Sequence, residues 1–438
     1  MTAKQPADAV ETIFPVQFGS HVRYAQGVKA GPWVFATGHL AQDYHSGIAR
    51  EVAESDRPFS RNGRASREAR AVLRNIGAVL SQGDCDYTDT VRLDQFYTAP
   101  ASVVHYQRER RQVLTAHIPP STSVIAKGFV LPNACISVDA IAYRTDDSAG
   151  IATFDRIDIA AAKSSGYKPS LRAGPLVFVA GATAEAQAGE PSIGGIAIDA
   201  HPHEGRRWQS VPIITQTQYV MERKLIPALE LAGSSLANVV KAQVYLTDKA
   251  DLDFFSQVWF DYFGNKPPAT TIIPCSDSSL AVEAACIEIN LLAVADDAGL
   301  PIERFGQGLL PGFDHYPAAT KAGDLLFISG LLAYGPNGLA ARRDLDQPYF
   351  ASHPQAQAEH ILGTAEQICG MAGTSLKKVV RAHQFHTDIS EFYAIHQAWR
   401  AYASDLHVPF SAIEMGSRFP IQDATVLMDL WVYAPDKT

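Results

Sequence analysis

The chain has 438 residues, of which 47% are hydrophobic, and a formal net charge of −9 at pH 7. This length and composition exclude a disordered chain and indicate about two to four globular domains. The acidic balance disfavours a nucleic-acid partner, and no stretch of about 18 apolar residues predicts a membrane-spanning helix.

One short sequence pattern occurs three times, and each copy predicts a strand. We call this pattern the opening phrase. GPWVFATG (31–38), GPLVFVAG (174–181) and GDLLFISG (323–330) each set a run of apolar residues between two glycines. Apolar residues on both sides of the pleat are typical of a strand that is covered on both faces. Each phrase follows a stretch running from a tyrosine to a glycine seven residues later. These stretches are YAQGVKAG (24–31), YKPSLRAG (167–174) and YPAATKAG (316–323).

A helix and then a strand follow each phrase. The helical patterns are REARAVLRNIGAVLSQG (67–83), TQYVMERKLIPALELAG (217–233) and AEHILGTAEQICGMAG (358–373). Their last residues, Gly83, Gly233 and Gly373, stand where a helix end needs a positive φ. The β-rich runs are DTVRLDQFYT (89–98), NVVKAQVYLT (238–247) and KVVRAHQFHT (378–387).

A second amphipathic helix and a proline turn complete each copy. Pro119, Pro267 and Pro409 mark the turns, and two closing strands follow each turn. The last strands are ACISVDAIAY (134–143), ACIEINLLAV (285–294) and ATVLMDLWVY (424–433).

The repeat period shows that each copy is a whole domain. Tyr24 and Tyr167 are 143 residues apart, and Tyr167 and Tyr316 are 149 apart. A solenoid repeat would span only about 20–50 residues. Two polar, glycine-containing stretches between the copies are typical of linkers, RTDDSAGIAT (144–153) and ADDAGLPIER (295–304). We therefore expect domains at residues 1–146, 147–297 and 298–438.

The element order within each copy predicts an α+β fold with helices on one face of the sheet. The opening strands are apolar on both sides, so the second sheet face also needs cover. Another copy is the simplest source of that cover. Three copies then close as a pseudo-threefold ring that buries the second faces against one another.

This ordered set of motifs resembles the RidA/YjgF family over nearly the whole chain, as three tandem copies. AGSSLANVVKAQVYLTD (232–248) and AGTSLKKVVRAHQFHTD (372–388) carry the resemblance most closely. It implies chorismate mutase-like domains in an intramolecular pseudo-trimer, with a central β-barrel and outer helices. It also implies small-ligand pockets between the copies and hydrolysis of enamines or imines with release of ammonia. Three unequal clefts are expected here.

The family's acidic residue on the last strand corresponds to Asp139 and Asp429. The second copy has Asn290 there, with Glu288 two residues earlier on the same face. The family's pocket tyrosine corresponds to Tyr24, Tyr167 and Tyr316. An acid beside a hydroxyl can move protons to and from water, although acids at strand ends and buried tyrosines can equally be structural. The suggested pairs are Asp139 with Tyr24 and Asp429 with Tyr316, and Glu288 is the fifth catalytic candidate.

The family's substrate-binding arginine has no counterpart in any copy. Its position falls at Ser121 or Thr122, at Ala269 or Thr270, and at Ser411. Arg418 does not fit the spacing. Because an arginine would bind a substrate carboxylate in a bidentate manner, carboxylate-bearing imines are poorer substrates for this chain. Tyr167, Ser121, Thr270 and Ser411 are therefore substrate-binding candidates.

Three histidines complete the substrate-binding candidates. His39 follows Gly38, the end of the first phrase, and is matched by Ala182 and Leu331. A polar residue in one copy alone indicates a function specific to the first copy, or a structural role. His117 and His407 precede the proline turns, near serines that a histidine can activate, although histidines in turns are often only solvated.

No cofactor or metal site is expected. No GxGxxG, P-loop or HExxH motif is present. The cluster HPHEGRR (201–207) lacks a third metal ligand at a fixed spacing, and His383 and His386 face opposite sides of a strand.

The chain is expected to be cytoplasmic, because it begins with a polar, acidic stretch and has five scattered cysteines without a CxxC motif. Whether the pseudo-trimer is monomeric or forms a further homo-oligomer stays open.

We interpret the chain as a hydrolase or deaminase that acts on a C=N, enamine or cyclic amide bond of a small metabolite. Ring-opening amidases built from three similar units make the cyclic amide plausible by analogy. A second interpretation is a non-catalytic small-molecule sensor that has lost the arginine. Ribonuclease activity, sometimes attributed to the family, is a weaker alternative that the acidic charge opposes. An acid and a hydroxyl meeting in an open cleft would favour catalysis, whereas an apolar pocket with hydroxyls alone would favour the sensor.

Overall fold

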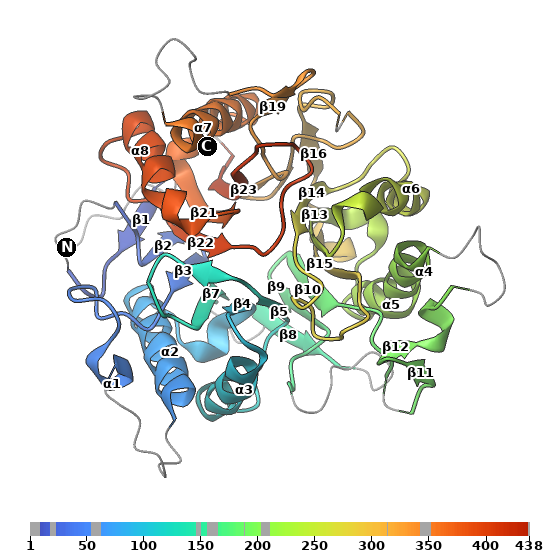
Figure 1. Ribbon diagram of the computed structural model, residues 1–438, viewed down its shortest axis with the longest axis horizontal. Helices are drawn as coiled ribbons and strands as arrows, with labels where there is room; N and C mark the ends of the chain where they lie inside the picture. Colours follow the sequence, from blue (N-terminus) through green and yellow to red (C-terminus); the bar gives the residue numbers. More distant parts are fainter. Residues whose placement is uncertain are drawn as a thin grey trace.

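The computed structural model describes residues 9–17, 23–53, 63–145, 150–155, 165–187, 189–202, 211–312, 314–341 and 352–436. Figure 1 shows three successive stretches of chain around a common centre, with helices on the outside and strands toward the middle. We call these stretches unit 1 (β1 to β7), unit 2 (β8 to β15) and unit 3 (β16 to β23). The expected boundary after residue 146 lies outside the described residues.

Unit 1 contains a sheet with the strand order β1-β2-β3-β7-β4-β5. Its strands are β1 (Val10–Ile13), β2 (Gly27–Ala30), β3 (Trp33–His39), β4 (Thr90–Tyr97), β5 (Ser121–Ile125) and β7 (Ile136–Tyr143). Its helices are α1 (Arg50–Ala53), α2 (Arg64–Gln82) and α3 (Pro100–Leu114).

Unit 2 repeats the sheet, in the order β14-β13-β15-β10-β9-β8. Its strands are β8 (Ile151–Phe154), β9 (Ser170–Ala173), β10 (Leu176–Ala182), β13 (Val239–Leu246), β14 (Ala269–Pro274) and β15 (Ile287–Val294), with a hairpin of β11 (Ser192–Ile193) and β12 (Ile196–Ala197). Its helices are α4 (Pro212–Tyr219), α5 (Ile226–Leu231) and α6 (Leu252–Phe263); a π-helical segment, Val220–Leu225, joins α4 to α5.

Unit 3 has the order β16-β17-β18-β23-β21-β22, and β6 of unit 1 extends this sheet beyond β22. Its strands are β16 (Ile302–Phe305), β17 (Ala319–Ala322), β18 (Leu325–Ile328), β21 (Val379–His386), β22 (Phe410–Glu414) and β23 (Val426–Tyr433), with β6 (Gly128–Phe129) and a hairpin of β19 (Tyr334–Gly335) and β20 (Gly338–Leu339). Its helices are α7 (His353–Met371) and α8 (Phe392–Tyr402).

The three sheets share one pairing pattern, which confirms a mixed α+β fold built from three repeats. In each sheet one pair is parallel, β4 with β5, β13 with β14, and β21 with β22, and the other pairs are antiparallel. The parallel strand follows the second helix, because a parallel connection needs a crossover of a dozen or more residues.

The ends of the long helices correct one prediction. Gly233 and Gly373 have φ of 71° and 72°, as expected, but Gly83 has φ −84°. In unit 1 the left-handed residue is Asp84, with φ 62°. The first copy is thus shifted by one residue at this turn, and an aspartate takes a conformation that glycine adopts more easily.

The inner sheet faces bury a shared aromatic core. Phe35, Phe178 and Phe327 occupy the same place in the three opening phrases, and each is at most 1% exposed. The Trp431 ring of unit 3 contacts Phe35 of unit 1 and Phe327, with centroid distances of 6.3 and 4.8 Å. Trp33 of unit 1 lies 6.1 Å from Phe178 of unit 2. Each buried aromatic contributes about 1.5–3 kcal/mol, so the phrase recurs because each unit covers the others.

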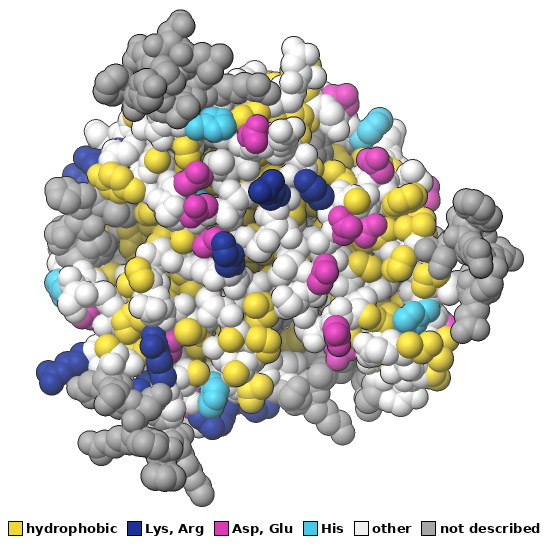
Figure 2. All heavy atoms as spheres, in the orientation of Figure 1, with side chains coloured by type: hydrophobic (Ala, Val, Ile, Leu, Met, Phe, Trp, Pro, Cys, Tyr) yellow, Lys and Arg dark blue, Asp and Glu magenta, His cyan; other side chains and the backbone are white. Residues whose placement is uncertain are grey.

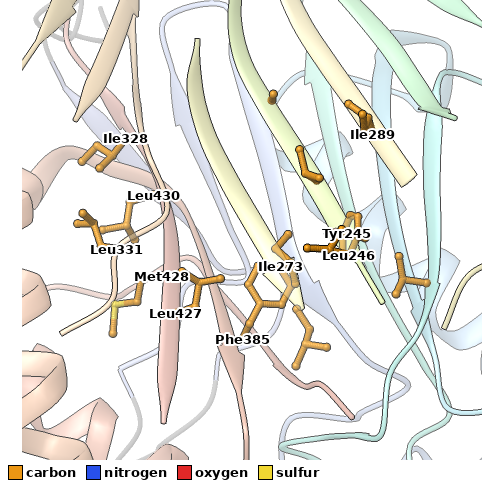
Figure 3. Close-up of a cluster of buried hydrophobic side chains, with 14 of the residues drawn as sticks. Tyr245, Leu246, Ile273, Ile289, Ile328, Leu331, Phe385, Leu427, Met428 and Leu430 are labelled. Carbon is orange, nitrogen blue, oxygen red and sulfur yellow. The ribbon is translucent and has the colours of Figure 1, made fainter. Parts of the chain in front are cut away.

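Apolar contact also continues between neighbouring units away from this core. Figure 3 shows Phe385 and Leu427 of unit 3 beside Ile273 of unit 2, and Tyr245 of unit 2 is in the same cluster. The Tyr245 and Phe385 rings meet edge to face at 6.5 Å.

A closed central barrel is not confirmed. Among the described residues no sheet closes on itself, and the three large sheets remain separate. Units 1 and 3 nevertheless share backbone hydrogen bonds. The Lys127 amide donates to the Glu414 carbonyl at 2.7 Å, and β6 pairs with β22.

A layer of buried charges crosses the middle of the molecule. Arg92, Lys241 and Arg381 occupy equivalent positions on β4, β13 and β21. Arg92 donates to Asp94 from Nε at 3.1 Å and from Nη2 at 2.7 Å, and Arg381 of unit 3 donates to the other oxygen of Asp94. Burial would raise the pKa of Asp94, but the two arginine charges outweigh it and lower the pKa to about 2.

The same layer joins unit 2 to unit 3 and unit 3 to unit 1. Lys241 Nζ lies 2.9 Å from Asp429 Oδ1, and Gln243 donates to Asp429 Oδ2 at 2.6 Å. His383 Nε2 of unit 3 lies 3.4 Å from Asp139 Oδ1 of unit 1. Each pair therefore connects two of the three units in a part of the molecule that water does not reach.

The outer surface is mixed in charge. Figure 2 shows lysine and arginine side chains scattered among acidic and apolar ones on the face in view. Among the described residues, no helix is both long enough and apolar enough to cross a membrane.

We predict that Asp94→Asn lowers the free energy of unfolding by about 3–5 kcal/mol, because it leaves two buried guanidinium groups without their shared carboxylate. Urea unfolding followed by circular dichroism measures the change. Asp199→Asn is the control. It breaks an ion pair with Arg223 whose side chains are 66% and 62% exposed, and it should cost less than about 1 kcal/mol. Equal effects would contradict a stabilising role for the charged layer.

Candidate functional site

Three joints between units hold the sequence-predicted site residues. We call them joint 1–2, where β5 lies against β10, joint 2–3, where β14 lies against β18, and joint 3–1, where β22 lies against β3. In each joint the strand after a proline turn meets the opening phrase of the next unit. The three joints are therefore built from equivalent elements, and their side chains differ.

The glycine that ends each phrase is required by this close approach. A Cβ atom on Gly38 would lie 3.3 Å from Ser411 Cα, and one on Gly330 would lie 3.2 Å from Thr271 Cα. At Gly181 the nearest obstacle is the carboxyl group of Glu288, followed by the Thr122 hydroxyl at 2.8 Å. Contacts below about 3.4 Å leave little room for any side chain, so glycine permits the backbones to meet.

Joint 1–2 contains a buried carboxyl group. Glu288, on β15 of unit 2, is 5% exposed and lies beside Gly181 and Thr122. Burial raises the pKa of Glu288 to about 8, Asp94 adds to the rise, and the Arg92 charge and the Ser123 amide oppose it. The carboxyl group is therefore protonated at neutral pH and can act as an acid.

Tyr167 belongs to the same joint. Burial raises the pKa of its hydroxyl, and the charge of Glu288 raises it further. The positive charge of Arg110, on α3 of unit 1, acts in the opposite direction. Arg110 is itself held by the Ser165 carbonyl at 2.6 Å. Joint 1–2 thus brings together an acid, a phenol and the hydroxyl of Thr122 from two units.

Joint 2–3 contains a small cavity that is partly open to solvent, with free space for about two water-sized species. Its polar lining consists of the hydroxyls of Thr270, Tyr316 and Ser329. The remaining lining residues are Leu252, Ile272, Leu310, Gly330, Leu332, Pro420 and Leu427. None of these residues has a carboxylate or an imidazole. Leu427 pairs with Phe385 as Glu288 pairs with Tyr245, so a leucine stands here where joint 1–2 has its acid.

Joint 3–1 contains His39, the histidine that directly follows the opening phrase of unit 1. His39 is fully buried, and its Nε2 lies 2.8 Å from the Gln26 carbonyl. Tyr44 Oη lies 3.2 Å from His39 Nδ1. Burial lowers the pKa of His39 to about 4, although Asp139 opposes the shift. The imidazole is neutral at pH 7, and both of its nitrogens have partners.

The predicted pair of Asp139 and Tyr24 lies in joint 3–1, but each group has other partners. Tyr24 donates to the Thr37 carbonyl. Asp139 accepts from the Gly38 amide at 3.0 Å and from the Ser411 hydroxyl of unit 3. The charge of Asp139 is near enough to raise the pKa of Tyr24, for which burial is the larger cause. These contacts fasten unit 3 to unit 1.

The second predicted pair, Asp429 and Tyr316, lies in two different places. Asp429 is 1% exposed and belongs to the charged layer, where it contacts Lys241 and Gln243. Tyr316 lines the cavity of joint 2–3.

The turn histidines are separate from the serines near them in sequence. His117 Nε2 lies 2.7 Å from the Thr90 carbonyl, and the His407 ring packs against Phe14 at 5.0 Å. Ser411 donates to Asp139, and Ser121 is buried at the start of β5. In the described part of the chain neither imidazole bonds to Ser121 or Ser411.

The HPHEGRR cluster lies only partly within the described residues, because residues 203–207 fall outside them. No group of three or more His, Cys, Asp or Glu residues is placed to hold a metal ion within the described ranges.

Sequence reasoning missed the charged layer and Ser329. A signal for the layer was present, because VRLD, VKAQ and VRAH put a cation at the same place in all three β-rich runs. Ser329 is the serine of the third opening phrase, where Thr37 and Ala180 stand in the others. Its position inside a cavity had no signal in the sequence.

Comparisons with known proteins agree on the repeated unit. The family model described as Endoribonuclease L-PSP matches residues 15–144, 158–295 and 310–431. The 3-aminoacrylate deaminase RutC of Acinetobacter baylyi is 31% identical over 96 residues, which are 22% of this chain and 70% of that protein. The RutC family protein PH0854 of Pyrococcus horikoshii is 33% identical over 110 residues, which are 25% of this chain and 74% of that protein.

Some solved structures match one unit of this chain, and another matches most of it. RidA from the Antarctic bacterium Psychrobacter sp. PAMC 21119 is 25% identical, with a TM-score of 0.25, and the match covers 30% of this chain and 98% of that one. A chorismatase structure is 13% identical, with a TM-score of 0.45, and that match covers 79% of this chain and 93% of the other.

We predict that replacing the acid of joint 1–2 changes how stability depends on pH. In the unfolded chain Glu288 ionises above pH about 4.3, whereas in the folded chain it holds its proton to about pH 8. Between these values the unfolded wild-type chain binds fewer protons, so its stability falls as the pH rises.

Glu288→Gln does not titrate, so its free energy of unfolding relative to wild type should rise from pH 5 to pH 8. The slope is at most about 1.4 kcal/mol per pH unit. Urea unfolding at pH 5, 6.5 and 8 measures it. A difference that stays constant with pH would show that the carboxyl group is not held protonated.

Proposed function

Because this chain belongs to the Endoribonuclease L-PSP family, the RidA/YjgF family, as three tandem copies, we propose that it hydrolyses a C=N, enamine or cyclic amide bond of a small metabolite. We place the reaction in joint 1–2. The observation that carries the proposal is Glu288, a carboxyl group that burial keeps protonated at neutral pH beside hydroxyls from two units. The relative named 3-aminoacrylate deaminase supports this class of reaction.

The chemistry needs only groups of the protein and a water molecule. With an imine substrate, Glu288 donates its proton to the nitrogen while water attacks the carbon. The resulting carboxylate takes a proton from the added water, which leaves a neutral carbinolamine. Glu288 then donates its proton to the amino group and takes the hydroxyl proton as the C–N bond breaks. The products are a carbonyl compound and ammonia, and Glu288 ends protonated. An acid whose pKa is near the working pH serves both transfers well.

The groups around Glu288 favour a substrate without a carboxylate. Thr122 stands near the place where the family resemblance expects an arginine, and its hydroxyl already accepts from Arg92 at 2.8 Å and from Asn290 at 3.1 Å. Tyr167 adds a phenol whose pKa the charge of Glu288 raises. Hydroxyls suit a neutral amide, imine or enamine, whereas a carboxylate is bound most tightly by a planar cation.

The proposal includes the arrangement of the units. We propose that the ring of three joints is the single-chain counterpart of a trimer. Contacts that pass from unit 1 to 2, from 2 to 3 and from 3 back to 1 support this reading. Closed rings satisfy every equivalent interface once.

We predict that Glu288→Gln lowers kcat/KM for ammonia release by at least about 100-fold, because the amide cannot donate the proton. A screen of imines, enamines and lactams with an ammonia assay measures turnover. Glu283→Gln is the matched control, an exposed carboxyl group on the same unit that should leave turnover unchanged. Turnover that survives Glu288→Gln would reject the proposed acid.

The pH profile gives a second test of the same group. If protonated Glu288 is the acid, wild-type kcat/KM should fall above about pH 8. A rate that continues to rise through pH 9 would contradict this role.

A second candidate function is small-molecule binding without catalysis, in joint 2–3. The cavity there supports it, because its polar groups are only the hydroxyls of Thr270, Tyr316 and Ser329. Leu252→Trp, which fills the cavity, should abolish binding of a lactam or enamine measured by calorimetry. Phe254→Trp, at a position 39% exposed on the same helix, should not. Ammonia release that survives Leu252→Trp would separate this function from the reaction in joint 1–2.

A ribonuclease remains the weakest interpretation. The net charge of −9 opposes binding to an RNA backbone, and the face in Figure 2 has its cations scattered.

A further inference from the structure

A small cavity lies where the charged layer brings the three units together. Its lining includes one cation from each unit, Arg92, Lys241 and Arg381. These side chains are only 5%, 2% and 2% exposed. The free space is about enough for one water-sized species. Its lining contains none of the proposed catalytic residues, although Arg92 and Asn290 also donate to Thr122 of joint 1–2.

The charges around the cavity are arranged unevenly. All three cations line it, whereas the carboxylates that balance them, Asp94 and Asp429, are not among the lining residues. Burial lowers the pKa of Lys241, and the positive charge of Arg381 lowers it further, against the attraction of Asp429. Like charges that face one cavity in a medium of low dielectric constant repel each other and attract an anion.

Two lining residues also present donors that have no acceptor. Arg381 Nε and Trp431 Nε1 are buried and lack a hydrogen-bond partner among the described residues. The two residues are held together, because the guanidinium of Arg381 lies 4.8 Å from the centroid of the Trp431 ring. A buried donor without a partner costs about 1–3 kcal/mol, so two of them beside one cavity indicate a missing acceptor.

We propose that this cavity binds one small monovalent anion of the halide class. A halide accepts hydrogen bonds from every direction and can satisfy both free donors while it neutralises the repulsion among the three cations. A water molecule would bring two donors of its own to a site already rich in donors. Polyatomic anions such as sulfate or phosphate exceed the space of one water-sized species.

The proposed ion has a structural role. It contacts side chains from all three units, so its binding free energy adds only to the state in which the units are assembled. The ion therefore strengthens the contact that joins the units without taking part in a reaction.

Crystals of the full chain grown with sodium bromide test the proposal directly, because bromide scatters anomalously. The expected result is one anomalous peak in the cavity, within contact distance of Arg381, Lys241 and Trp431. Density at the cavity without an anomalous signal would mean a water molecule only and would overturn the proposal.

Thermal unfolding at constant ionic strength gives an independent test. Replacing sodium gluconate with sodium chloride should raise the midpoint of the wild-type protein by roughly 2–4 °C, and the rise should saturate. Trp431→Phe, which removes one donor and keeps a smaller aromatic ring, should lose this response. Trp399→Phe is the matched control, because Trp399 is also buried, with an indole nitrogen that has no partner in the described part of the chain, but lies on α8. Equal responses to both salts in wild type, or a full chloride response in Trp431→Phe, would overturn the proposal.

Discussion

The fold depends on the burial of three sheet faces against one another. Helices cover the outer face of each sheet, and among the described residues the inner faces pack against one another in one buried cluster. Phe35, Phe178 and Phe327 carry the same contact in each copy, and Trp431 bridges two of them. Because burial of apolar area is the largest favourable term in folding, the inner faces hold the units together. The joints that hold the candidate site residues lie where neighbouring units meet.

Joining the copies in one chain lets each joint change by itself. Ser137, Glu288 and Leu427 occupy one strand position in units 1, 2 and 3. In a homotrimer all three would be the same residue. Here joint 1–2 has a buried glutamate, and joint 2–3 has a cavity lined by apolar side chains and three hydroxyls. Joint 3–1 has a neutral histidine fixed by hydrogen bonds. This difference is why the proposed reaction and the second candidate function fall in separate joints.

The repeats and their elements could be predicted from the sequence, because the same order of strand and helix patterns occurs three times and each copy supports the others. The clefts could be predicted less well. Alignment puts Asp139 and Asp429 on β7 and β23, the counterparts of the strand that carries Glu288. It cannot show that a position two residues further along this strand contacts the charged layer. The one-residue shift at Asp84 was hidden because a glycine stood next to it. The cavity of joint 2–3 depends on the volumes of side chains from distant segments, which no local pattern reports.

The contact between the last unit and the first has a consequence for synthesis. Backbone hydrogen bonds link Ala25 to Val408 and Lys127 to Glu414, so unit 1 is completed by residues near the end of the chain. At about 5–20 residues per second, a ribosome needs tens of seconds to pass from unit 1 to β22. During that time the strand edge of the first unit that β22 will pair with stays without its partner.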